Sequence, residues 1–363
     1  MIYWTLIFFS LLFCSLWASQ VKEYNKKRQV FIILAVILIY LSSFRLGLGQ
    51  DYSGYLSKIA WESETGVVNW FNEPLMTLVS LFVEATFFTP LLFFLLFSLV
   101  TISGVFSFYV REDNMHKIAC MVIFTLFPLL FFNTFNLVRQ FAAAGIFYYS
   151  ITFIDKKEIF RFYICILFAV SIHLTALILL PLYFILDKKY HPITILLCVA
   201  GLFVFFKYAY PYIESYAVFD SRFGGYLDTD REMGVSGMII LYNLMGVLML
   251  FLRRRFNNRL EIISFNLFFL FILFSNLSYV NYYFFRIAVY FSPVFAYVFP
   301  KLVSEIFGRK YSITASWLFG LFFLIPFLLG GINNPIIVPS GILPISALWD
   351  ENIYKIVYSI NPE

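Results

Sequence analysis

Arginines stand near the beginning of two apolar segments in this sequence, at positions that ordinary helix chemistry does not favour. In FNTFNLVRQFAAAG, Arg139 lies between Asn136 and Gln140, just before a run of small residues. The N-terminus of a helix attracts anions, so an arginine there needs another reason. A phosphate group would supply one, because main-chain amides and a forked guanidinium both bind it. The alternative is an arginine that extends to a membrane interface beside a tight helix pair.

The second segment is SYVNYYFFRIAVYFSP, in which Arg286 lies about one helical turn inside the apolar run. Tyr282 and Tyr290 stand four residues before and after it, on the same helix face. A charge within an apolar segment is costly in a membrane and usually lines a cavity. We therefore predict that Arg286 and Tyr282 contact a bound anion or sugar.

A third polar set is FRLGLGQDYSGY, which contains Arg45, Asp51, Tyr52 and Tyr55 together with Gly47 and Gly49. Glycines let the backbone turn where a helix leaves a membrane and allow a ligand to approach closely. Asp51 and Tyr55 would share a face if a helix restarts here. The alternative is an interfacial turn with a belt of aromatic residues.

His173, in AVSIHLTA, is a candidate general base. An imidazole can take a proton from a sugar hydroxyl near neutral pH if the hydroxyl lies within hydrogen-bonding reach. A lone histidine in an apolar helix is more often a packing residue or an interhelical hydrogen-bonding residue. Both interpretations remain open on the sequence context alone.

The segment DSRFGGYLDTDRE places Arg222 among several carboxylates. A solvated loop whose charges neutralise one another is the default interpretation, although such a loop would also admit a sugar chain. Its Asp228 and Asp230 come closest to a metal-binding DxD pair, but the flanking arginines argue against a metal. We expect neither a metal nor another cofactor.

Composition identifies the elements that must position these residues. Hydrophobic residues make up 61% of the 363 residues and charged residues 13%, whereas an average soluble domain is about a quarter charged. A water-soluble fold of this length could not hide that much apolar surface. We predict one integral membrane domain over residues 1–363, with the lipid bilayer as a partner. The sequence has neither a basic tail nor the spacing of a zinc finger, so it does not suggest nucleic-acid binding.

A membrane-spanning helix needs about 20 apolar residues, because its backbone groups must bond to one another within hydrocarbon. Clear spans are predicted at 2–19, 29–45, 89–110, 117–134, 139–155, 192–210, 236–252, 261–278, 284–300 and 312–330. Basic clusters between them mark the cytoplasmic side. The outer side then holds the loops 46–72 and 211–235 and the tail 331–363.

Two segments leave the topology open. Residues 73–88 are short for a span and are interpreted as a re-entrant or interfacial helix at the outer face. Residues 160–186 are long for one span, and basic residues flank both ends, so we predict a short hairpin with His173 at its turn. The alternative makes 73–88 a true span and 160–186 a single crossing. The fold prediction is an all-α, polytopic bundle of about 11–13 spans.

The polar residues together suit a substrate with a lipid tail, a diphosphate and a glycan. At these residues the chain resembles the EpsG/Wzy-like family of polysaccharide polymerases. The resemblance rests on RLGLGQDYSGY, on Glu73 and Pro74, on NLVRQFAAAG and on A-x-x-x-H-L-T-A. It covers residues 30–190 well and the C-terminal half loosely. Arg45, Asp51, Arg139 and His173 match its motif positions.

The resemblance implies a GT-C-like architecture and an inverting, metal-independent glycosyltransferase that joins undecaprenyl-diphosphate-linked repeat units into O-antigen, capsule or exopolysaccharide. It also implies a bacterial inner membrane location, an active site that faces outward, and a chain-length regulator protein as a partner. We predict Arg139 and Arg286 on the diphosphate, His173 as base or proton relay, and Asp51 as the competing base. The diphosphate or the glycan would contact the remaining candidates, Arg45, Tyr52, Tyr55, Asn136, Gln140, Arg222 and Tyr282.

Two rival functions remain at this point. A lipid-linked oligosaccharide flippase would have charged residues along a central cavity that reach both faces. A membrane acyltransferase that modifies sugars would place its histidine and arginine near a cytoplasmic entrance for the acyl donor. The second rival is tied to the alternative topology, in which Arg139 would be cytoplasmic.

Overall fold

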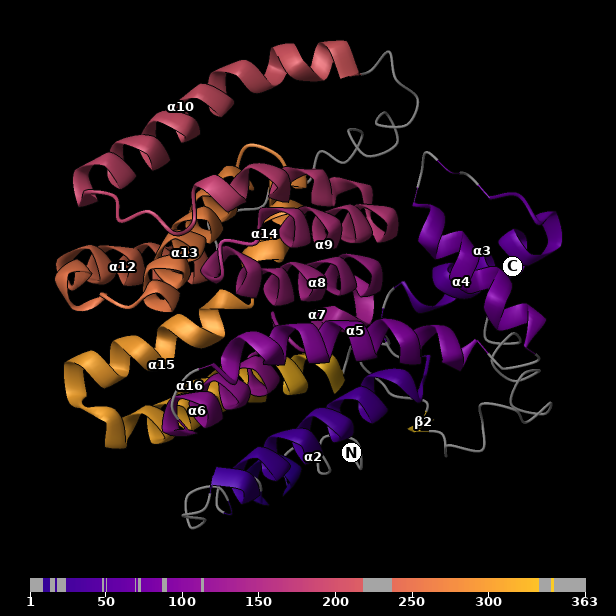
Figure 1. Ribbon diagram of the computed structural model, residues 1–363, viewed down its shortest axis with the longest axis horizontal. Coiled ribbons are helices and arrows are strands. Elements are labelled where there is room, and N and C mark those ends of the chain that lie inside the picture. Colours follow the sequence, from indigo (N-terminus) through magenta and orange to yellow (C-terminus); the bar gives the residue numbers. More distant parts are fainter. Residues whose placement is uncertain are drawn as a thin grey trace.

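A computed structural model describes residues 9–13, 17, 24–47, 49, 51–68, 70, 73–86, 90–111, 114–217, 237–332 and 341–342. Figure 1 shows a bundle of helices that run mostly along one direction. The chain is an all-α polytopic membrane bundle, as predicted. Arg222, most of the predicted outer loop 211–235 and nearly all of the tail 331–363 lie outside the described residues.

The helices follow one another along the chain with short connections. In order they are α2 (Tyr24–Ser43), α3 (Tyr52–Thr65), α4 (Pro74–Ala85), α5 (Leu91–Tyr109), α6 (Asn114–Leu126), α7 (Asn133–Asn136), α8 (Val138–Asp155), α9 (Ile159–Ile172), η1 (Leu174–Phe184), α10 (Pro192–Ala217), α12 (Gly237–Phe251), η2 (Arg253–Arg255), α13 (Arg259–Leu277), α14 (Tyr283–Phe291), α15 (Val294–Phe307), η3 (Arg309–Tyr311) and α16 (Ser312–Ile332). Two short strands, β1 (Arg45–Leu46) and β2 (Gly341–Ile342), pair antiparallel with Arg45 opposite Ile342.

Four helices of the described chain are long and apolar enough to cross a membrane, namely α5, α13, the first part of α10, and η3 with α16. A fifth span results if α14 and α15, which meet at a bend of 59°, count as one. Several shorter apolar helices pack between them. The larger number of 11–13 spans and the GT-C-like architecture stay predictions.

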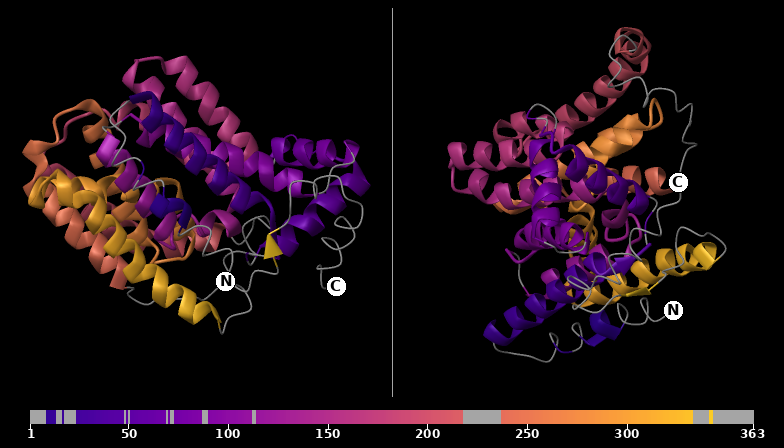
Figure 2. Two further views of the ribbon diagram at one scale, coloured as in Figure 1. Left: turned by 90° about the horizontal axis from the view of Figure 1, so that it is seen from below. Right: turned by 90° about the vertical axis from the view of Figure 1, so that its right-hand side faces the viewer.

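Helices α5 and α8 form the centre of the bundle and meet without intervening side chains. A Cβ atom on Gly104 of α5 would lie 2.2 Å from the carbonyl oxygen of Gly145 of α8. Such close approach of two backbones is typical of membrane helices with small residues at their interface. Helix α2 packs against α5, and α9 packs against α8. Figures 1 and 2 show α3 and α4 together at one end of the long axis, whereas α10 lies apart from the centre.

The segment 160–186 forms a hairpin. Its two arms, α9 and η1, meet at His173, whose extended backbone (φ −150°, ψ 112°) ends the first arm. The rings of Phe162, near the start of α9, and Tyr183, near the end of η1, lie 5.4 Å apart. Both arms therefore return to the same level, which confirms the predicted hairpin, and the alternative of a single crossing is wrong. Helix α4 has only 12 residues, so it fits the predicted short helix better than a span.

Four sequence predictions need correction. The predicted span 117–134 ends at Leu126, because Pro128 restricts the residue before it and cannot donate a main-chain hydrogen bond. Turns and the short α7 fill the remainder. The predicted outer loop 46–72 contains the 14-residue helix α3, and α10 extends into the loop predicted at 211–235.

The fourth correction concerns the predicted span 284–300, which is broken at Ser292 and Pro293. Two buried tyrosines bond to main-chain carbonyls at this break. Tyr148 of α8 donates to the oxygen of Phe291 at 3.0 Å, and Tyr109 of α5 donates to that of Pro293 at 2.7 Å. Irregular backbone at membrane depth is tolerated where protein groups satisfy it in this way.

Candidate active site

Glu73 is the centre of a group of charged residues at the α3–α4 end of the bundle. It directly precedes Pro74, a favoured first residue of a helix, and α4 begins there. One carboxylate oxygen, Oε1, lies 2.5 Å from Nδ1 of His173, and the other, Oε2, forms an ion pair with Arg139. Lys58 Nζ lies 3.9 Å from Oε2. Glu73 is therefore a buried carboxylate held in one position by its partners, unlike a charge on the solvated surface.

Three separate elements bring the partners of Glu73 together. Arg139 lies in the first turn of α8, His173 forms the turn of the hairpin, and Lys58 projects from the middle of α3. The main-chain N–H of Leu174 also points to Oε1 of Glu73 at 3.4 Å. Arg139 and His173, which the sequence predicted separately as site residues, therefore contact the same carboxylate.

The electrostatics of the site keep Glu73 ionised. Burial alone would raise its pKa, but the hydrogen bond from His173 and the charges of Arg139 and Lys58 outweigh burial and lower the pKa to about 2. Burial and the nearby Arg139 lower the pKa of Lys58, and the carboxylates of Glu73 and Glu62 partly offset that change. Anion and cations thus stabilise one another in a partly desolvated setting.

Asp51 lies beside this group, at the N-terminus of α3. Reduced hydration raises the pKa of its exposed carboxyl, and the charges of Arg286 and Arg139 partly counteract that effect. Tyr55, one turn later, donates to the main-chain oxygen of Asn136 at 3.1 Å, and the Arg139 guanidinium lies 5.7 Å from its ring centre. A helix does begin here, so Asp51 and Tyr55 stand one turn apart at the start of α3.

Helix α14 also contributes to the group. Gln140 of α8 donates from its side-chain amide to the main-chain oxygen of Arg286, so α8 fixes the position of α14. Tyr290, one turn after Arg286, bonds to the Thr175 hydroxyl at 2.8 Å, and its ring lies nearly parallel to that of His173 at 6.4 Å. The two predicted arginine segments therefore meet at one place.

The chain matches the model of the EpsG family over residues 28–344, which is most of its length. It belongs to the EpsG family. This membership identifies a membrane protein of polysaccharide-polymerase type, with glycosyltransferase-like activity in polysaccharide biosynthesis. No curated protein and no solved structure matched the chain. The matched range contains every charged residue of the site described above.

Several predicted substrate residues of this EpsG-family protein lie beneath the site and not on its surface. Arg45 is 1% exposed; it donates to the main-chain oxygens of Ser42 at 2.6 Å and Phe135 at 2.9 Å. Its guanidinium also lies 4.8 Å from the ring centre of Phe94. Tyr52 is equally buried and stacks on Phe94. These positions fix the backbone next to α7 and leave a ligand no access to Arg45 or Tyr52.

The remaining predicted residues fall at the edge of the group. Asn136 supplies a main-chain oxygen to Tyr55, and its side-chain oxygen lies 2.9 Å from where a Cβ of Gly49 would stand. Gly49 also has a φ of +111°, which favours glycine. Tyr282 directly precedes α14 and stacks on Phe285.

Glu73, Lys58 and Tyr290 are the site residues that the sequence prediction did not assign. Glu73 was visible only as part of the Glu-Pro pair, which reads as an ordinary helix start. Lys58 had a usable signal, because Asp51, Tyr55 and Lys58 recur at intervals of four and three and so share one face of α3. No local pattern reveals that Glu73 and His173, 100 residues apart in the chain, are in contact.

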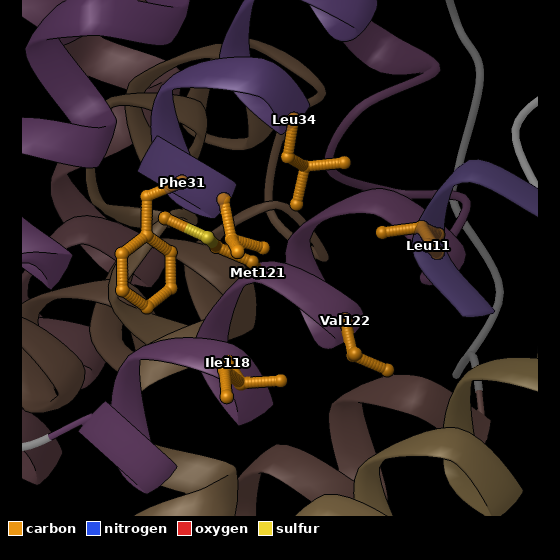
Figure 3. Close-up of a pocket in the computed structure, with 7 residues that line it drawn as sticks. Leu11, Phe31, Leu34, Ile118, Met121 and Val122 are labelled. Atoms are coloured by element: carbon orange, nitrogen blue, oxygen red, sulfur yellow. The ribbon is translucent and has the colours of Figure 1, made fainter. Parts of the chain in front are cut away.

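The described chain also has a small pocket that shares no residue with the site (Figure 3). It lies between residues 9–13, α2 and α6, and its lining consists entirely of apolar side chains: Leu11, Val30, Phe31, Leu34, Ile118, Met121 and Val122. Such a lining provides no group for acid–base chemistry. The candidate active site therefore rests on the charged group around Glu73.

Proposed function

We propose that this EpsG-family protein is a Wzy-type polysaccharide polymerase of the bacterial inner membrane. It would join undecaprenyl-diphosphate-linked oligosaccharide repeat units on the outer face. The observation that supports this proposal is the meeting of His173, Arg139 and Arg286 at one end of an apolar bundle. A base and two cations at the membrane surface match a sugar hydroxyl and a lipid-borne diphosphate.

The proposed reaction is one displacement at the anomeric carbon of the growing glycan. The hydroxyl oxygen of the incoming repeat unit attacks that carbon while Nε2 of His173 takes the hydroxyl proton. The bond from carbon to the diphosphate oxygen breaks, and the lipid diphosphate leaves with the electron pair. Attack opposite to the leaving group inverts the configuration. The product is a glycan longer by one unit on the new carrier.

Arg286 would stabilise the charge that develops on the leaving diphosphate, and Arg139 would assist it. Arg139 already forms an ion pair with Glu73, so Arg286 carries more of this role in our proposal than the sequence suggested. A guanidinium fork binds phosphate oxygens in pairs, which suits a diphosphate without a divalent cation. Asp51, next to both arginines, would orient the acceptor and remains the competing base.

The test is replacement of Arg286 by Gln in cells whose surface glycan is displayed on gels. We expect long-chain glycan to fall about 10²-fold, because one lost transition-state donor costs about that much, and glycans with a single repeat unit to remain. The control is Arg161→Gln, whose side chain is exposed and pairs with Glu158 at the hairpin base. Normal long-chain glycan in both Arg286→Gln and His173→Ala would refute the proposal. Loss of even the single repeat units on deletion of the gene would instead indicate a flippase.

A further inference from the structure

Glu73 contacts the proposed base through one nitrogen of the ring only. The distance from Nδ1 of His173 to Oε1 of Glu73 is 2.5 Å, which is a short hydrogen bond. An ionised carboxylate can only accept hydrogen bonds, so Nδ1 must carry the shared proton. In a neutral imidazole the other nitrogen, Nε2, then holds the lone pair. The geometry therefore selects the atom that can act as base.

We propose that Glu73 is a positioning residue for catalysis, which fixes His173 in the tautomer whose Nε2 faces the acceptor hydroxyl, and that Arg139 and Lys58 hold Glu73 as an anion. This inference rests on the proposed function and adds a role for two residues outside the arginine and histidine motifs. Glu73 would also stabilise the imidazolium that forms once Nε2 has taken the proton. The imidazolium later releases that proton to water.

The backbone at Glu73 supports this role. Its φ is +55°, a left-handed conformation that non-glycine residues seldom adopt. Such conformations persist only where surrounding contacts enforce them, and they concentrate at functional sites. Here the following residue begins α4, and the carboxylate is bonded to the hairpin turn through both His173 and the N–H of Leu174. The strained residue thus ties α4 to the turn that carries the base.

Other residues also hold the imidazole of His173 in place. The ring of Tyr290 of α14 lies beside it, with 6.4 Å between the ring centres and 29° between the planes, and the bond between Tyr290 and Thr175 fixes that ring. The charged groups around the imidazole are Glu73 in direct contact, with Arg139 of α8 and Lys58 of α3 behind the carboxylate. The side chain of His173 remains 15% exposed. It is therefore oriented but still accessible.

The experiment compares Glu73→Gln with wild type in a purified assay with lipid-linked repeat units. We expect kcat to fall about 10²-fold, because the amide NH₂ can bond to the wrong tautomer, while KM changes little. Glu73→Asp should recover part of the activity. The matched control is Glu62→Gln. Glu62 is a buried carboxylate on α3 that bonds to Thr77 and lies near the same Lys58, and this variant should keep kcat within about threefold.

A further readout separates positioning from a merely structural role. Glu73→Gln should cost nothing further in a His173→Ala background, because the effects of residues that act as one unit are not additive. The inference would be overturned if the losses of kcat multiply in the double variant, or if Glu73→Gln has a normal kcat.

The outcomes also separate this inference from the proposed function. An inactive His173→Ala together with a fully active Glu73→Gln would reject the positioning role alone. Activity in His173→Ala and Arg286→Gln would reject the proposed polymerase site itself. If Glu73→Gln fails to accumulate in the membrane, Glu73→Asp takes its place in the double variant with His173→Ala, and losses that multiply there would overturn the inference.

Discussion

Replacement of Gly104 by alanine tests whether the contact between α5 and α8 positions the site. The added Cβ would lie 2.2 Å from the carbonyl oxygen and 2.4 Å from the carbonyl carbon of Gly145. Ordinary contact begins near 3.4 Å, so the two helices must separate by roughly 1 Å. A gap of that size forfeits about a quarter to a half of the dispersion energy along the interface. Both neighbours are backbone atoms, which cannot rotate out of the way.

The expected cost follows from two opposing terms. Overpacking of a well-packed core costs about 1–3 kcal/mol, and the backbone contact places this site at the upper end. Alanine in a helix interior is more favourable than glycine by about 1 kcal/mol. The net loss is therefore about 2 kcal/mol. Arg139 lies six residues before Gly145 on α8, and a displacement of about 1 Å at a catalytic group can reduce the rate about 10²-fold.

The assay is thermal unfolding of the purified protein in mild detergent, followed by glycan length in cells. Gly201→Ala provides the matched control, because it lies inside α10 and nothing stands within 4 Å of its added Cβ. We expect a lower unfolding midpoint and shorter glycan for Gly104→Ala, and an unchanged or slightly higher midpoint for Gly201→Ala. Equal midpoints in the two variants would refute the close packing of α5 on α8.

Two further predictions concern stability in the same assay. Contacts lower the pKa of Glu73 from 4.5 to about 2. The ionised carboxylate therefore stabilises the fold above pH 4.5, and this contribution is lost as the pH falls toward 2. Glu73→Gln, which lacks the carboxylate, should lose less stability than wild type between these pH values. Tyr148→Phe removes the donor to the buried carbonyl of Phe291 and should cost about 1–2 kcal/mol. The exposed neighbour Tyr149, changed to Phe, should cost nothing measurable; equal effects of the two tyrosine variants would refute the assigned bond.

The sequence was sufficient for the class of fold and for most of the charged residues of the site. Arg139, His173 and Arg286 are rare charged or titratable groups in apolar surroundings, so each of them is conspicuous without a structure. The hairpin around His173 was also predictable, because basic residues flank both of its ends. What the sequence could not give is the pairing between these residues, which depends on contacts 66 and 100 residues apart along the chain.

Helix ends were the weakest part of the prediction. An average over about 20 residues finds apolar stretches, but it does not detect a break that other parts of the protein satisfy. The turn after Leu126 lies among buried phenylalanines. At the break near Pro293, Tyr109 and Tyr148 from two other helices bond to main-chain oxygens. Arg45 shows that the role of a conspicuous residue is also hidden. An arginine bonded to main-chain oxygens is indistinguishable in sequence from one that binds substrate.

The two ends of α8 distinguish the functions that the sequence left open. Arg139 at its start and Asp155 at its end lie about 24 Å apart at 1.5 Å per residue, and the segment between Gln140 and Asp155, FAAAGIFYYSITFI, carries no charge. At the far end Asp155 and Asp187 pair with Arg259, at 3.6 and 2.9 Å, and so neutralise it. A flippase needs polar groups that continue from one face to the other. Along its central helix this chain instead gathers its reactive groups at one end, where His173 and Arg286 meet, and that arrangement favours chemistry at one membrane surface over transport across it.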